Sequence, residues 1–215
     1  MRRYRDMFKA TAEANAHFDR FFVGMGLQQV SATHIELRWR GQMGSRAVEV
    51  WLTNIGKWEV GSTHIRVVLP TTVEALVTVG GTVPPLKRVG MKGFGSLAPT
   101  LKTYAHDIEW GHSVFCTQPG VELLQRLDNL GCLQFEPGRI VWSDDIKPRD
   151  DAWVTGQLYL LAALAAASEQ LPPGKPVPDS VIRRHAAAIA IAVGVLVTAC
   201  IGGIIVAVIA ATTSG

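Results

Sequence analysis

The feature that most constrains this chain is an uninterrupted apolar run close to its C-terminal end. Residues 186–211 include no charged residue, no Asn or Gln and no Pro, and their only polar members are Thr198 and Cys200. As a helix the run would rise ~39 Å, whereas the hydrocarbon core of a bilayer is ~30 Å thick. A buried core helix of that length keeps a polar face, and this run has none. The pattern therefore predicts one membrane-spanning helix over residues 186–211, followed by a short polar tail at residues 212–215.

The residues flanking the run predict its orientation. Arg183 and Arg184 precede it, and no charged residue follows it. Because positive charge is retained on the cytoplasmic side, the large N-terminal part is expected in the cytoplasm. The basic start at residues 1–5 continues into Asp6 without the apolar segment of a signal peptide. We expect a single-pass, tail-anchored membrane protein whose first partner is the lipid bilayer.

Small residues recur four apart within the run, at Ala199, Gly203 and Ala207. Such a stripe lets two helix backbones approach closely, which would support self-association or packing against a protein partner in the membrane. Ala and Gly are also common in membrane helices generally, so an incidental stripe is the alternative.

A proline-rich segment separates the run from the rest of the chain. Residues 171–180 hold four prolines, so residues 171–185 are predicted to be an extended juxtamembrane linker. A second apolar stretch, residues 158–167, is too short to span a bilayer and predicts a buried helix of the domain.

Residues 1–170 mix helical and strand periodicity. A domain of strands followed by helices favours an α+β fold with a mostly antiparallel sheet and flanking helices, ahead of the one C-terminal transmembrane helix. Residues 80–105, rich in Gly and Pro, are expected to be a long loop. The predicted helices are residues 5–23, 119–129 and 152–170, and the predicted strands are residues 35–40, 47–52, 63–69, 75–79, 109–117, 132–135 and 139–142.

Charge and cysteine content exclude several classes of function. The chain has 21 Lys and Arg against 18 Asp and Glu, scattered rather than gathered in one stripe, so nucleic acid is not expected as a partner. The three cysteines show no metal-type spacing and no disulfide framework. No phosphate-binding glycine motif occurs either, and neither a cofactor nor a metal is expected.

Few residues in the sequence are candidates for a catalytic role. His106, Asp107 and Glu109 lie within a short polar stretch and could run acid–base chemistry, and Cys116 follows as a candidate nucleophile. Read as a strand, this stretch places the histidine on the opposite face from the two carboxylates, so exposed polar residues at a strand entrance are the simpler interpretation. Cys116 then reads as a buried packing residue.

Tryptophans on predicted strands usually serve the core. Trp39, between Arg38 and Arg40, could instead mark a sheet face that binds a partner.

Residues 35–170 resemble bacterial membrane-associated proteins that have no assigned activity. The resemblance is carried by the Gly-x-x-Gly-x-Arg turn at residues 41–46, the predicted strand after Asp107, the leucine-rich helix at residues 121–130, and a hairpin ahead of a long apolar helix. At residues 108–115 the chain departs from the Phe-Asp-x-x-Phe pattern of those proteins. The resemblance implies the architecture and no catalytic residue.

These observations favour a membrane-tethered, non-enzymatic interaction module with a cytoplasmic domain. Two alternatives stay open: an enzyme at the membrane surface that uses the four candidate residues, or a subunit of a larger membrane complex.

Overall fold

The computed structural model describes residues 2–33, 36–53, 63–81, 83, 88, 90–95, 100–127, 131–146 and 151–179. Its strands form one nine-stranded sheet in the order β1-β2-β3-β4-β9-β8-β5-β7-β6, and every neighbouring pair is antiparallel. The elements in chain order are α1 (Arg2–Gly24), β1 (Leu27–Ala32), β2 (Glu36–Met43), β3 (Arg46–Thr53), β4 (Thr63–Pro70), β5 (Val77–Gly80), β6 (Lys92–Gly93), β7 (Lys102–Ala105), α2 (Ile108–Phe115), α3 (Gln118–Arg126), β8 (Cys132–Glu136), β9 (Arg139–Ile146) and α4 (Asp151–Gln170). The predicted α+β fold with a mostly antiparallel sheet and flanking helices is confirmed.

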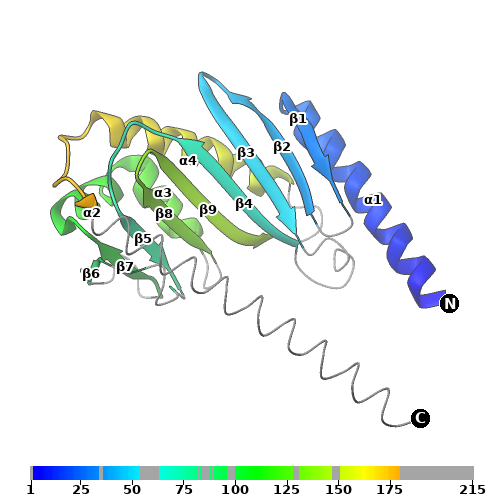
Figure 1. Ribbon diagram of the computed structural model, residues 1–215, viewed down its shortest axis with the longest axis horizontal. Coiled ribbons are helices and arrows are strands. Elements are labelled where there is room, and N and C mark those ends of the chain that lie inside the picture. The colour runs from blue at the N-terminus through cyan, green and yellow to red at the C-terminus, as the bar shows by residue number, and fades with distance from the viewer. Residues whose placement is uncertain are drawn as a thin grey trace, which may run out of the picture.

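The alternation of side chains along the strands gives the sheet two different faces. On one face Trp39, Val50, Val67 and Trp142 are paired across four neighbouring strands, and each is 0% exposed. The described helices pack against this face (Figure 1). We call the other side of β2, β3 and β4 the open face.

Three helices divide the covered face between them through aromatic contacts. Phe22 of α1 lies 4.8 Å from Trp39, measured between ring centroids. Trp153 of α4 lies 5.6 Å from Trp142, and α2 contacts the β8 region of the sheet. The helix predicted at residues 158–167 lies within α4, and its Leu158, Leu161, Leu164 and Ala165 are all 0% exposed, which confirms the prediction of a buried helix.

The strands predicted at residues 35–40 and 47–52 form the β2–β3 hairpin, with a tighter turn than expected. The turn was expected within residues 41–46, but Gly41 lies within β2 and pairs with Val48. The reversal occurs at Gly44 and Ser45, where Gly44 adopts a φ of +63° that favours glycine.

Two segments have a secondary structure other than the one predicted. The strand expected at residues 109–117 is helix α2, because Asp107 caps its N-terminus and a helix buries Trp110, Val114 and Phe115 together. The long loop expected at residues 80–105 includes β6 and β7, which extend the sheet beyond β5.

No helix among the described residues combines the length and the hydropathy needed to cross a membrane. The predicted span at residues 186–211 lies outside the described residues, as do Arg183, Arg184 and the stripe of Ala199, Gly203 and Ala207.

Candidate functional site

Asp107, the first carboxylate candidate, is engaged in structural hydrogen bonds. Its Oδ1 accepts from the backbone N–H groups of Glu109 at 3.1 Å and Trp110 at 3.4 Å, which caps α2. Its Oδ2 accepts from the backbone N–H of Lys175 at 2.8 Å. These bonds, the one from Lys175 first, lower the pKa of Asp107. An ionised carboxylate held in this way is suited to fixing the backbone and poorly suited to exchanging protons at neutral pH.

The other three candidates do not converge with Asp107. The side chain of Glu109 is 88% exposed, and its carboxylate lies 3.8 Å from the Lys175 ammonium group. His106 precedes α2 and its Nδ1 lies 3.4 Å from the carbonyl oxygen of Gly90. Cys116, expected to be buried, is exposed at the C-terminal end of α2, where its Sγ lies 3.4 Å from Nδ1 of His112.

Among the described residues, Asp107 thus serves as a helix cap, and Cys116 lies at the other end of α2. Among them, no group of three or more His, Cys, Asp and Glu side chains is arranged to hold a metal ion. Cys116 and Cys132 do not form a disulfide bond.

The start of the predicted linker, residues 171–179, lies against the domain, and we call it the strap. Besides the hydrogen bond from Lys175, Gly174 packs on the indole of Trp110 so closely that a Cβ at this position would lie 3.0 Å from the ring. A cavity of about 380 Å³ separates parts of the strap from the end of α4 and from residues 72–74. A side chain at position 174 would therefore require the Trp110 ring to shift by a few tenths of an ångström.

A second contact fixes the end of α4 immediately before the strap. The carboxylate of Glu169 accepts hydrogen bonds from the guanidinium group of Arg46, from the Thr71 hydroxyl at 2.9 Å and from the Thr72 backbone N–H at 3.1 Å. The bonds from Arg46 are the largest cause that lowers the pKa of Glu169 to about 2. This cluster joins α4 to the β2–β3 hairpin and to the end of β4.

The open face carries an aromatic ring held between two guanidinium groups. Arg38, Trp51 and Arg66 are directly paired across β2, β3 and β4. The guanidinium carbon of Arg38 lies 4.9 Å from the Trp51 ring centroid, and that of Arg66 lies 5.4 Å from it. Such cation–π contacts contribute about 0.5–1 kcal/mol each at exposed sites, so the ring is held at the surface rather than in the core.

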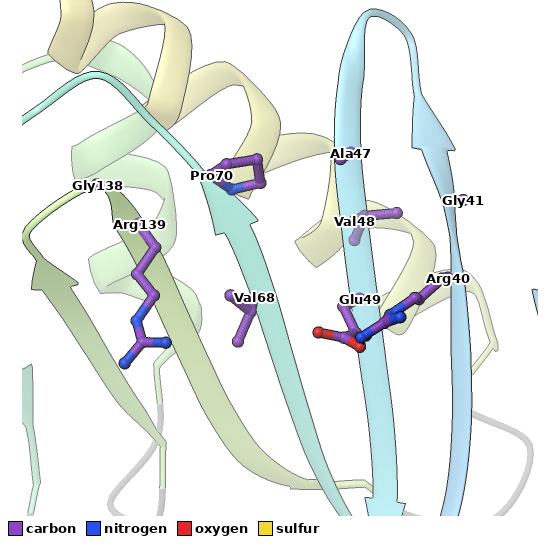
Figure 2. A pocket seen from close by; sticks show the side chains of 9 residues that line it. All are labelled: Arg40, Gly41, Ala47, Val48, Glu49, Val68, Pro70, Gly138 and Arg139. Atoms are coloured by element: carbon purple, nitrogen blue, oxygen red, sulfur yellow. Dashed lines mark hydrogen bonds and ion pairs between the residues drawn. The ribbon is translucent and has the colours of Figure 1, made fainter. Parts of the chain in front are cut away.

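A groove of about 320 Å³ runs beside this stack on the same face. Figure 2 shows Val68 and Pro70 of β4 lying between Arg139 of β9 and the pair formed by Glu49 and Arg40. The floor is apolar, and the guanidinium groups at its sides are paired, Arg40 with Glu49 and Arg139 with Glu136. The groove can therefore accept an extended segment with apolar side chains. The lining residues are Arg40, Gly41, Ala47, Val48, Glu49, Val68, Pro70, Gly138 and Arg139.

Trp39, which the sequence offered as a mark of a binding face, is buried instead. It is 0% exposed, and its indole N–H donates to Asp19 of α1 at 3.2 Å. The binding candidate on the open face is Trp51, which is half-buried and which sequence reasoning missed. The signal was available, because period two in residues 47–52 places Val48, Val50 and Leu52 on one face and Glu49 and Trp51 on the other.

Comparisons with known proteins identify the fold and no family. No model of a protein family matches the chain, and no curated protein matches its sequence. A solved structure, described as the crystal structure of the mycobacterial trehalose monomycolate transport factor A, TtfA, is similar with a TM-score of 0.53 and 14% sequence identity. The similarity covers 81% of this chain and 99% of that one. The likeness at this identity shows a shared fold.

Proposed function

We propose that this protein is a membrane-tethered accessory factor in membrane-associated transport, with a non-enzymatic cytoplasmic domain that binds a protein partner through its open face. The observation that carries the proposal is the stack of Arg38, Trp51 and Arg66 beside an apolar groove. Trp and Arg are enriched among the residues that dominate binding energy at protein interfaces. The apolar run at residues 186–211 supports the tether, with the domain on the side of Arg183 and Arg184.

The candidate catalytic residues favour binding over catalysis. Asp107 is engaged by backbone N–H groups, and Glu109 lies at the surface beside Lys175. The similar fold of TtfA, by its title a transport factor for trehalose monomycolate, supports a role in transport. It does not supply this chain's cargo.

Photo-crosslinking in cells tests the proposal on the full chain. A crosslinking amino acid replaces Val68 in the groove, and a control chain carries it at Tyr159, which lies on the outer side of α4 and is 64% exposed. We expect a discrete protein adduct from position 68 and not from position 159.

The adduct must also depend on the stack. Trp51→Ala should reduce its yield about tenfold or more in a chain that remains folded, because a truncated interface anchor costs on the order of 2 kcal/mol. Identical adducts from both positions, or an adduct indifferent to Trp51→Ala, would contradict binding at the open face.

A further inference from the structure

Because the strap lies on the domain, it shortens the tether between the domain and the predicted membrane span. Read from composition, residues 171–185 are a spacer, but residues 171–179 lie on the domain through the contacts of Asp107 with Lys175 and of Trp110 with Gly174. Only residues 180–185 remain between the strap and the predicted span. Six residues reach at most about 20 Å when fully extended.

The place where the strap lies determines which part of the domain is nearest the bilayer. Val177 lies with His106, Leu76 and Val77, beside β5 and the end of β7. The chain therefore leaves the domain at the end of the sheet that carries β7 and β6, and Figure 1 shows this end far from α1 and β1. Eight strand spacings of about 4.8 Å separate the two edges of the sheet by about 38 Å, which exceeds the reach of the six residues.

This end of the sheet carries exposed positive charge. Lys92 of β6, Lys102 of β7 and Lys175 of the strap are all exposed, and we call them the edge patch. Lys175 lies near Asp107 and Glu109, whereas no described carboxylate forms an ion pair with Lys92 or Lys102. A lysine close to an anionic bilayer surface contributes about 1 kcal/mol of attraction.

We propose that the edge patch rests on the headgroups of anionic lipids, so that the domain lies against the membrane by its β6–β7 edge. This inference rests on the proposed anchoring by residues 186–211. The occupant is a lipid surface because the tether keeps this edge within about 20 Å of the bilayer and because exposed lysines complement anionic headgroups.

Labelling of amines on the full chain tests the inference. The protein is placed in vesicles of phosphatidylcholine with phosphatidylglycerol, and the modification rates of Lys92 and Lys102 are compared with those in detergent micelles by mass spectrometry. Arg20→Lys introduces a matched reporter amine on α1, at an exposed position of the opposite end. We expect the rates at Lys92 and Lys102 to fall at least fivefold in the vesicles and the rate at position 20 to stay unchanged.

A second variant tests the strap itself. Gly174→Val puts a side chain against the Trp110 ring and should free the strap, which lengthens the tether to residues 171–185. Protection of Lys92 and Lys102 should then fall at least twofold, whereas Pro178→Ala at an exposed strap position should preserve it.

Flotation of the same vesicles distinguishes a failure of the proposed membrane anchor from a failure of the inference about the edge patch. A chain that does not float overturns the membrane anchor and the inference with it. A chain that floats while Lys92 and Lys102 react as fast as in micelles, or while the amine at position 20 is equally protected, overturns the inference alone.

Discussion

Trp39 and Trp51 lie on neighbouring strands of one hairpin and have opposite roles. Trp39 is fully buried under α1 and donates to Asp19, whereas Trp51 lies on the open face between Arg38 and Arg66. The same residue type lies in the core on one side of the sheet and is half-buried at the surface on the other, where we propose that it binds a partner. The face that a tryptophan occupies therefore decides its role, and identity alone does not.

The largest effect is expected on the covered face. Trp39→Ala removes a fully buried indole and leaves a cavity between α1 and the sheet, so the free energy of unfolding should fall by about 3–5 kcal/mol. Urea unfolding of the full chain in detergent, followed by circular dichroism, measures it. A decrease in the free energy of unfolding of less than about 1 kcal/mol would contradict the assignment of Trp39 to the core.

A smaller effect is expected where the hairpin meets the end of α4. Glu169→Gln loses the charge-assisted hydrogen bonds from Arg46 and should lower the free energy of unfolding by about 1–3 kcal/mol. The pKa of Glu169 is lowered from 4.5 to about 2, so its stabilisation is complete above pH 4.5 and is lost as the pH falls toward 2. Unfolding across that pH window should show the loss in the natural chain and a flatter profile in Glu169→Gln.

A smaller effect still is expected at the cap of α2. Asp107→Asn keeps a side chain able to cap the helix but loses the charge that accepts from Lys175, and about 0.5–1 kcal/mol should be lost. Amide hydrogen exchange should speed up in residues 171–179 and stay unchanged in β2 and β3. Equal exchange in the strap of both chains would show that Asp107 does not hold it.

A stability effect well below that of Trp39→Ala is expected at Trp51. Trp51→Ala removes two cation–π contacts of about 0.5–1 kcal/mol each, so the free energy of unfolding should fall by about 1–2 kcal/mol while crosslinking at the groove is lost. The same unfolding and crosslinking measurements serve here. A stability loss equal to that of Trp39→Ala would show that Trp51 belongs to the core after all.

The sequence predicts the parts of this fold whose signal is local. The β2–β3 and β8–β9 hairpins show alternation and turn residues, and the structure has both. Helix α2 was mistaken for a strand because its Trp, Val and Phe favour strands, although Asp107 ahead of it is a capping signal. Strands β6 and β7 are short and surrounded by Gly and Pro. They join the sheet because β7 pairs with β5 and β6 pairs with β7, which no local pattern shows.

In the candidate site, too, local patterns are visible in the sequence and contacts between distant residues are not. The alternation in β3 could have pointed to Trp51, but the stack needs Arg66 from β4, and only the pairing of those strands brings it there. The strap depends on a glycine meeting Trp110 far away in the sequence, a contact that proline content does not reveal. Residues 171–179 were predicted to be a spacer because a high proline content indicates a stiff, extended chain. Proline content does not indicate whether that chain packs on the domain.

The ladder between β4 and β9 has a consequence for the order in which the protein can be made. It pairs Thr63 with Ile146 and Pro70 with Arg139, and it joins the meander of β1 to β4 with the rest of the sheet. During synthesis the meander is complete well before β9 emerges, so β4 waits as an unpaired strand edge, the kind of surface on which nascent chains aggregate. β9 leaves the ribosome before residues 186–211 do, so the sheet can close before this apolar run has emerged.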